Sequence, residues 1–397
     1  MAESGPLYLL DGSSLVFRAF FALPEDLATS SGTVTNAVHG FVSMLIMLLR
    51  DHAPSGIAVA FDRSAPTFRD EIVPDYKGHR PEVPETLRPQ FDLVRAVLDS
   101  LGIVRADLDE YEADDILATL ATQARDAGRE VVVVTGDRDC FQLVEDPHVT
   151  VLYTRRGLSD TVRYDEAGIE ERYGVRPAMY PLLAALRGDP SDNLAGVPGV
   201  GEKTAAKLVK AYGSLDGIFA HVGELTPKLR ENLASSEEVV RRNARIIPLV
   251  RDVPLDFGLA DLGLGRWDVE EARRIFAELE MRNAWQRLSP LLGVGAGPGG
   301  ADGHGLGAGG ADGDEGAGSP VPRPTGLVAT GSAAETAAAV EAAVAGAPVL
   351  VVAGRWSGDP GRSPLVGLAI GGVGGDGDGV PAGGDDACCW RATRCSR

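Results

Sequence analysis

The chain has 397 residues, enough for two or three domains that each bury a core. A formal net charge of -19 argues against a protein whose whole surface attracts nucleic acid, and four cysteines without spaced pairs argue against a disulfide-built fold. The N-terminal residues lack the basic and long apolar regions typical of a secretion signal, and no apolar run approaches the roughly 20 residues that cross a bilayer. We therefore expect a cytoplasmic protein without membrane contact.

Three apolar runs in the first 140 residues lead into aspartates. Such runs are typical of buried parallel strands, and helical and strand patterns alternate up to about residue 290, so the sequence predicts an α/β fold. An aspartate after one strand is usually a turn former or helix cap. Several at the carboxyl edge of one sheet indicate a ligand site, because ligands of open α/β sheets bind there. The acids after these runs are Asp11, Asp62, Asp137 and Asp139.

A basic segment follows the second run. Residues 63–88 contain six Arg, Lys or His side chains, with Phe68 and Tyr76 between them and four prolines that disfavour long regular structure. Basic and aromatic side chains together suit a single-stranded or frayed DNA end. A solvated loop is the alternative.

Two further clusters add acids. Residues 111–115 read Y-E-A-D-D at the start of a predicted helix, and residues 188–193 read G-D-P-S-D-N. The helix dipole accounts for one or two acids but not for three within four residues. Carboxylates suit Mg²⁺ or Mn²⁺, and two ions about 4 Å apart can hydrolyse phosphodiesters. The nine candidate ligands are Asp11, Asp62, Glu112, Asp114, Asp115, Asp137, Asp139, Asp189 and Asp192.

Residues 196–210 have the pattern of a helix-hairpin-helix, a DNA-binding element. Glycines permit tight turns and close backbone approach, and backbone N–H groups at the start of the next helix can hold a phosphate. Such hairpins contact the backbone and do not discriminate sequence. The predicted DNA-binding residues are Gly196, Val197, Gly199, Val200, Gly201, Lys203, Thr204, Lys207 and Lys210.

The composition changes after residue 292, over about the last quarter of the chain. Of the 26 residues from 293 to 318, 13 are glycine, which predicts a flexible linker over about 291–325. Residues 333–345 are expected to be helical, and P-V-L-V-V-A-G and L-V-G-L-A-I-G-G are expected to form two short strands. Residues 372–397 are expected to be disordered, since the final C-C-W-R-A-T-R-C-S-R resembles no folded element.

Five segments occur in one order: LYLLDGSSLVFRAFFAL, AFDRSAPTFRDEIVPDYKGHR, DEYEADDILATLA, VVVTGDRDCFQLV and GDPSDNLAGVPGVGEKTAAKLV. Over residues 5–290 the chain resembles the 5′-nuclease domain of bacterial DNA polymerase I and its flap-endonuclease relatives. The resemblance implies a PIN-like, mostly parallel sheet flanked by helices in a catalytic domain, residues 1–175, followed by a helix-hairpin-helix subdomain, residues 176–290.

The resemblance also implies roles. The acids up to Asp115 would serve a first metal ion, and the later four a second. Residues 66–90 would form an arch in which Tyr76, Lys77 and Arg80 match a YKxxR motif, so that Lys77 and Arg80 contact the scissile phosphate. Arg18 would have a similar role, and the hairpin would grip duplex DNA, with K⁺ as a possible ligand.

The implied activity is hydrolysis at DNA 5′ ends, flaps and RNA primers by a monomer, in repair and primer removal beside a DNA polymerase. Residues 326–371 resemble the start of a degenerate proofreading domain that lacks the Asp-x-Glu of an active one. The sequence leaves open a standalone nuclease or a truncated or frameshifted polymerase I. It also admits a non-catalytic DNA-binding module, which would gain nothing from nine carboxylates.

Overall fold

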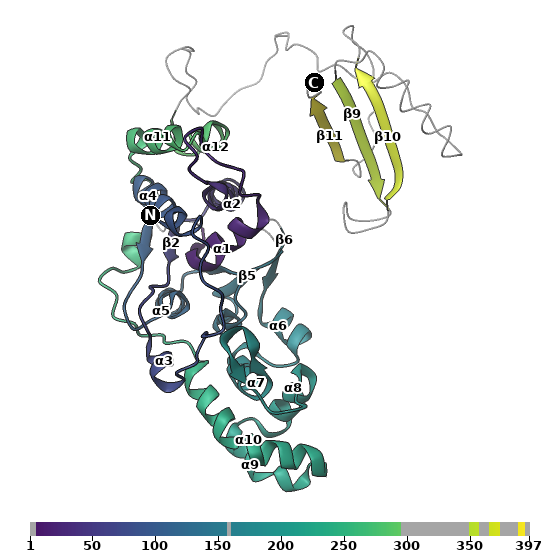
Figure 1. The fold of residues 1–397 in the computed structure, drawn as a ribbon. Helices are drawn as coiled ribbons and strands as arrows, with labels where there is room; N and C mark the ends of the chain where they lie inside the picture. The colour runs from purple at the N-terminus through teal and green to yellow at the C-terminus, as the bar shows by residue number, and fades with distance from the viewer. Residues whose placement is uncertain (1–4, 157–159, 295–348, 357–364, 374–387, 394–397) are drawn as a thin grey trace. The chain divides into compact units, whose positions relative to one another are not determined.

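The computed structural model describes residues 5–156, 160–294, 349–356, 365–373 and 388–393 (Figure 1). Residues 1–302 form one compact unit and residues 303–397 a second. Within the described residues, no helix is both long and apolar enough to span a membrane.

The first unit is built on a six-stranded sheet. Its order is β3-β2-β1-β4-β5-β6, and every neighbouring pair is parallel except the antiparallel pair of β5 and β6. The central strands β1, β2 and β4 are buried along their whole length, as their apolar runs predict. This confirms the predicted mostly parallel sheet. The strands are β1 (Leu7–Asp11), β2 (Gly56–Ala60), β3 (Val104–Ala106), β4 (Val131–Thr135), β5 (Val149–Arg156) and β6 (Asp160–Tyr164).

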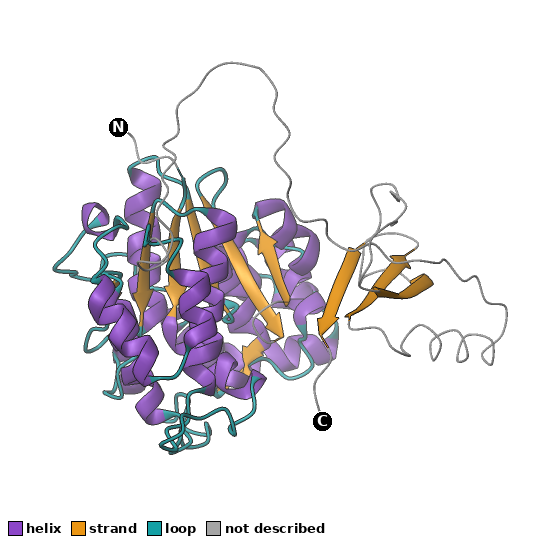
Figure 2. Cartoon of the chain, turned by 90° about the horizontal axis from the view of Figure 1, so that it is seen from above, coloured by secondary structure: helices purple, strands orange, loops and turns teal. Residues whose placement is uncertain are grey.

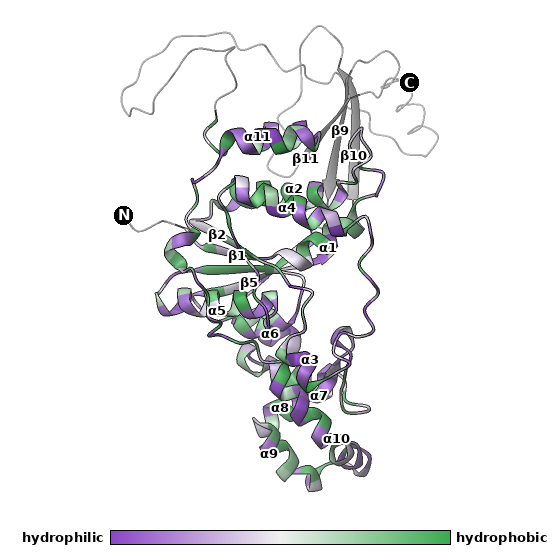
Figure 3. Ribbon diagram, turned by 60° about the vertical axis from the view of Figure 1, so that its left-hand side comes forward, coloured by the Kyte–Doolittle hydropathy of each residue, from purple (hydrophilic) through white to green (hydrophobic). Residues whose placement is uncertain are grey.

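Helices cover both faces of this sheet (Figure 2). Side chains along β1 alternate between two hydrophobic cores: Leu7 and Leu9 belong to one, Tyr8 and Leu10 to the other. Figure 3 shows how hydrophobic β1 is along its length. The helices on the Tyr8 side are α1 (Gly12–Ala22), α2 (Asn36–His52), α4 (Arg88–Ser100), α11 (Val269–Glu278) and α12 (Arg282–Leu288).

The core on the Leu7 side extends into the second half of the unit. It contains α5 (Ala113–Asp126) against the sheet and continues through a group of helices around the predicted hairpin. These helices are α6 (Glu166–Tyr173), α7 (Tyr180–Arg187), α8 (Glu202–Tyr212), α9 (Leu215–Ala220) and α10 (Pro227–Ile246). Between α7 and α8 the chain forms the short antiparallel pair β7 (Gly188–Asp189) and β8 (Leu194–Ala195). The helix-hairpin-helix is therefore α7, this loop and α8.

The proline-containing segment after β2 has little regular structure, as its composition indicates. The short helix α3 (Phe68–Ile72) begins with a capping box between Thr67 and Asp70, and turns then lead to α4. The predicted arch, residues 66–90, consists of this helix, the turns and the first residues of α4.

The second unit contains a three-stranded antiparallel sheet of order β10-β9-β11. Two of its strands, β9 (Val349–Trp356) and β10 (Leu365–Val373), agree with the two expected from the sequence. The third, β11 (Cys388–Thr393), contradicts the expectation that residues 372–397 lack structure. Its backbone pairs with an edge of β9, a tertiary partner that local composition does not reveal.

The other C-terminal expectations meet the structure only in part. The expected helix at 333–345 and most of the linker at 291–325 lie outside the described residues. The first linker residues, however, belong to the folded unit, because Leu292 is buried and Val294 packs against the core.

Candidate active site

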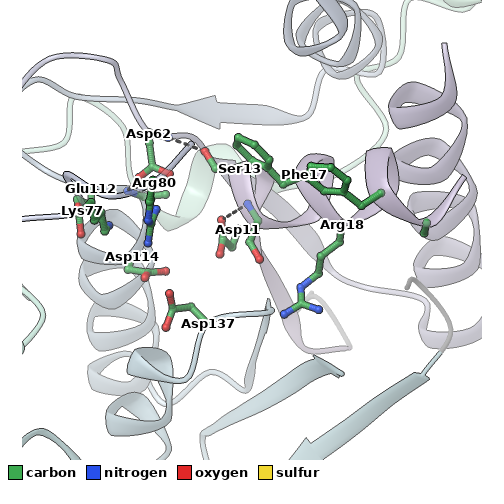
Figure 4. Close-up of a pocket in the computed structure, with 14 residues that line it drawn as sticks. Asp11, Ser13, Phe17, Arg18, Asp62, Lys77, Arg80, Glu112, Asp114 and Asp137 are labelled. Atoms are coloured by element: carbon green, nitrogen blue, oxygen red, sulfur yellow. Dashed lines mark hydrogen bonds and ion pairs between the residues drawn. The ribbon is translucent and has the colours of Figure 1, made fainter. Parts of the chain in front are cut away.

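A pocket of about 430 Å³ lies at the carboxyl edge of β1, β2 and β4. Five of the nine predicted metal ligands line it together with three basic side chains, so it gathers residues from five separate segments of sequence (Figure 4). The acids are Asp11, Asp62, Glu112, Asp114 and Asp137, and the basic residues are Arg18, Lys77 and Arg80.

Asp11 is placed by the junction between β1 and α1. It caps α1 by accepting a hydrogen bond from the Ser14 backbone N–H at 2.9 Å, and its other oxygen accepts one from the Thr135 hydroxyl at 2.7 Å. Burial, with repulsion from Asp62, raises the pKa of Asp11 to about 7. A carboxylate held in this way repels its neighbours and is stabilised by any cation that enters.

Asp62, Asp114 and Asp137 lie around Asp11 in the same pocket. Asp62 accepts a hydrogen bond from the Ala113 N–H, and Asp137 accepts one from the Asp139 N–H, both at 2.9 Å. Burial raises the pKa of Asp114, and repulsion from Asp11 and Asp137 raises it further. Burial likewise raises the pKa of Asp137. The pocket therefore holds more negative charge than its hydrogen bonds compensate.

Three further predicted ligands, Asp139, Asp189 and Asp192, lie on the hairpin side of the acidic pocket. Asp192 is buried and accepts hydrogen bonds from the Tyr76 hydroxyl at 2.9 Å and from Arg80 Nη2 at 2.7 Å. Asp189 accepts the Ser191 N–H at 2.8 Å. One oxygen of Asp139 is buried with no hydrogen-bond partner among the described residues. Burial raises the pKa of Asp139, and repulsion from Asp137 and Asp192 adds to it.

Asp115 does not belong to this group, which corrects the prediction for that residue. Its side chain is fully buried and forms a two-bond pair with Arg69, at 2.6 and 2.8 Å, and it also accepts the Val250 N–H at 2.9 Å. Its remaining contact is with the Glu112 N–H, in the capping box of α5. Asp115 therefore has the surroundings of a structural ion-pair partner, and only Glu112 and Asp114 of this acidic run line the pocket.

Lys77 and Tyr76 reach the site from the arch. Lys77 Nζ lies 2.6 Å from Glu112 Oε1, and although burial lowers its pKa, Glu112 and Asp192 raise that pKa above the usual value. Tyr76 is buried and its hydroxyl is donated to Asp192, so it does not line the pocket. Within the YKxxR motif, the Tyr76 hydroxyl therefore orients an acid of the site, and its ring supports Lys77, whose Nζ lies 5.0 Å from the ring centroid.

Arg18 crosses from α1 to the end of β4. Its Nη2 donates to the Gly136 carbonyl at 2.8 Å, and it lines the pocket. A Cβ atom at position 136 would overlap the guanidinium, so glycine is required there for this path. The arginine is held by backbone carbonyls and keeps its charge available to a ligand.

The predicted hairpin residues divide into two groups. Gly199 has a φ of +75°, a conformation that favours glycine, and Gly201 caps α8. Val197 and Val200 are buried in the core, so their side chains shape the loop, and their predicted part in DNA binding would rest on their backbone groups. Gly196 and Thr204 are half-buried, and three lysines are exposed along α8: Lys203, Lys207 and Lys210.

Sequence reasoning missed two arginines and a cysteine. A second cavity, of about 500 Å³, is lined by Arg138 and Arg187 beside Arg80, Asp137 and Asp189. The position of Arg138 between Asp137 and Asp139 was the available signal. The buried Cys140 donates its thiol hydrogen to Asp114 at 3.3 Å.

Among the residues described, no group of three His, Cys, Asp or Glu side chains is preformed as a metal cage. This does not conflict with the donor set, because Mg²⁺ keeps several waters and binds proteins through one or two carboxylates. The mutually repelling oxygens of the buried Asp11 and the half-buried Asp114 and Asp137 fit a hard divalent cation.

Two family models match the chain: "5'-3' exonuclease, N-terminal resolvase-like domain" over residues 6–174 and "5'-3' exonuclease, C-terminal SAM fold" over residues 175–270. A Streptomyces coelicolor 5'-3' exonuclease is 41% identical over 298 residues, which cover 70% of this chain and 98% of that protein. DNA polymerase I of Mycobacterium bovis is 51% identical over 297 residues, 74% of this chain. The chain spans only 32% of that polymerase's length.

Solved structures share the fold. The phage T5 D15 protein co-crystallised with metal ions gives a TM-score of 0.52 at 22% identity, with 70% of this chain and 99% of that chain covered. A T5 D15 flap endonuclease variant solved as a pseudo-enzyme-product complex with DNA and metal ions gives a TM-score of 0.52 at 20% identity, with 73% and 98% covered.

Proposed function

The chain belongs to the 5′-3′ exonuclease family, and on that basis we propose that it hydrolyses phosphodiester bonds at DNA 5′ ends and 5′ flaps. The observation that carries this proposal is the pocket at the sheet edge, where five carboxylates lie opposite three basic side chains. A pure DNA-binding module has no use for buried acids beside a phosphate, since they repel it.

Two divalent cations, Mg²⁺ or Mn²⁺, would be held by the acids. Asp11, Asp62, Glu112, Asp114 and Asp137 would serve the first, and Asp139, Asp189 and Asp192 with Asp137 the second. Such cations supply an activated water at neutral pH and offset charge on the leaving oxygen.

The basic residues would position the phosphate. Lys77 Nζ is 2.6 Å from Glu112 and points into the pocket, so the scissile phosphate would exchange with that carboxylate as its partner (Figure 4). Arg80 and Arg18 present further N–H donors at the same pocket. Because Glu112 and Asp192 raise the pKa of Lys77, its ammonium group stays positively charged at neutral pH.

Outside the pocket, the exposed lysines of α8 would hold the duplex backbone, with K⁺ as a possible ligand of the hairpin. We also propose that the protein acts as a cytoplasmic monomer beside a DNA polymerase, on flaps and RNA primers.

The direct test uses a 5′-labelled flap substrate and the full chain. We expect cleavage with Mg²⁺ or Mn²⁺ and none in excess EDTA. Asp137→Asn should lower kcat by orders of magnitude while DNA binding, measured by anisotropy in EDTA, stays equal or tightens. Undiminished cleavage in EDTA would refute the metal-dependent reading, and tight binding without cleavage under any metal would favour the DNA-binding module.

A further inference from the structure

The second cavity lies beside the acidic pocket and shares Arg80 and Asp137 with it. One wall is the end of β4 and the neighbouring β5, through Arg138 and Tyr153. The other wall is the hairpin, through Arg187, residues 189–191 and the first residue of α8. A strand that leaves the acidic pocket towards the hairpin therefore reaches this cavity next.

The arginines of this cavity differ in how they are held, and Arg138 is the most available of them to a ligand. Arg138 is exposed and has no ion pair among the described residues. Arg187 lies 3.6 Å from Asp189 and 3.9 Å from Glu202, beyond hydrogen-bond distance in both cases. By contrast, Arg80 is already bound to Asp192 at 2.7 Å.

We propose that this cavity binds the phosphodiester group next to the scissile one, on the duplex side, with Arg138 as its main ligand and Arg187 as its second. The inference rests on the proposed function and adds a subsite to it. A guanidinium presents a fork of N–H donors that matches two phosphate oxygens, and an arginine without a carboxylate partner gains most from such a ligand. The duplex side follows because the hairpin forms the far wall and the exposed lysines of α8 continue from it.

The test combines a variant with a modified substrate. Arg138→Gln removes the charge, and Arg176→Gln is the matched control, because Arg176 is also exposed, has no ion pair in the described part of the chain and does not line the cavity. The probes are fluorescein-labelled 5′-flap duplexes with a neutral methylphosphonate at one of three successive linkages around the cleavage point. Binding is measured by anisotropy in EDTA, where no metal-dependent cleavage occurs.

For the unmodified flap we expect Arg138→Gln to raise Kd about tenfold and Arg176→Gln to change it less than about twofold. The slope of log K against log salt should fall by about 0.9 for Arg138→Gln, the share of one phosphate. In the unaltered protein, the methylphosphonate next to the cleavage point on the duplex side should weaken binding. In Arg138→Gln that same substitution should have little further effect, while substitutions at the other linkages still weaken binding.

The proposal would be overturned if Arg138→Gln and the methylphosphonate weakened binding independently at all three linkages, so that their effects on Kd multiplied. Arg138 would then act at no particular phosphate. Arg138→Lys keeps the charge without the fork and should give an intermediate Kd; it also serves if Arg138→Gln is unfolded by circular dichroism. A protein that binds the flap but never cuts it would refute the proposed hydrolysis, while the binding scan would still decide the subsite.

Discussion

Asp11 and Asp115 are both buried aspartates, but only Asp115 has a cation against it in the structure. Its pair with Arg69 uses both terminal guanidinium nitrogens, Nη1 and Nη2, and Arg69 Nε donates to the Ile246 carbonyl at 2.9 Å. We predict that Asp115→Asn destabilises the protein by about 3–5 kcal/mol, because a buried guanidinium loses its counter-charge. Urea unfolding followed by circular dichroism measures this, and replacing Arg69 and Asp115 together by apolar residues should recover part of the loss. Full stability with lost metal affinity would make Asp115 a ligand after all.

Asp11→Asn should have the opposite effect when metal is chelated. The folded pKa of Asp11, about 7, lies above its ordinary value of 3.8, so its contribution to stability is complete at low pH and is lost as pH rises through 7. Asparagine caps helices as well as aspartate does and carries no charge. We therefore expect a higher Tm for Asp11→Asn at pH 8 in EDTA, by on the order of a few degrees, and little difference at pH 4. An equal change in Tm at both pH values would show that repulsion is not the cause.

Residues 112–115 show what the sequence cannot predict about single side chains. The residue types and spacing indicated that some carboxylates of residues 112–115 face a ligand. They could not tell that Asp115 points to Arg69, since that arginine is 46 positions away in the chain and is brought near only by tertiary folding. The sequence could not show that Tyr76 donates to Asp192 either, because that acid is 116 positions away.

Among the elements, α8 allows binding to be separated from catalysis. Lys203 and Lys207 are exposed on it and neither lines the acidic pocket. Changing both to alanine should weaken duplex binding about tenfold and lower the salt slope by about 1.8, with kcat nearly unchanged. Lys77→Ala should instead lower kcat at saturating substrate by on the order of a hundredfold or more. Steady-state kinetics at several salt concentrations distinguishes the two, and Arg274→Ala on the distant α11 is the control for a lost charge. Identical defects would contradict this division.

Strands and helices were more predictable than the contacts between them. Buried parallel strands need continuous apolar runs, so β1, β2 and β4 could be read from composition together with the acids that follow them. The strand β11 could not, because its pairing with β9 depends on backbone hydrogen bonds that any short extended segment can make. The burial of Val197 and Val200 likewise depends on the packing of α7, α8 and α10 around the hairpin.

For the whole molecule, the structure moves the end of the folded nuclease unit. The Val294 N–H donates to the Ser289 carbonyl at 3.0 Å, and α12 buries Ala284 and Leu288 against the core that contains α2. A chain ending at Val294 should therefore cut flaps at the full-length rate with an unchanged Tm. One ending at Glu280 should lose several kcal/mol of stability through the loss of α12, since each buried large apolar side chain contributes about 1.5–3 kcal/mol. Thermal unfolding and flap cleavage at equal concentrations test both. Lost activity in a folded 1–294 chain would show that the second unit takes part in cleavage.

The pair between Arg69 and Asp115 also limits how the two halves of the folded unit can be recombined or expressed separately. Arg69 lies in the arch, Asp115 in α5, and their other partners, the backbones of Ile246 and Val250, lie at and beyond the end of α10. The two family models meet between residues 174 and 175, so this group of hydrogen bonds connects residues of both. Arg69 and Asp115 both lie in the N-terminal half, so recombination at that junction would leave the ion pair intact. A foreign C-terminal half could position its hairpin in the same way only by offering a carbonyl and an amide group at the same two places. Halves expressed separately would each expose their partners in these hydrogen bonds to water. We expect such halves to associate or aggregate rather than to work as independent modules.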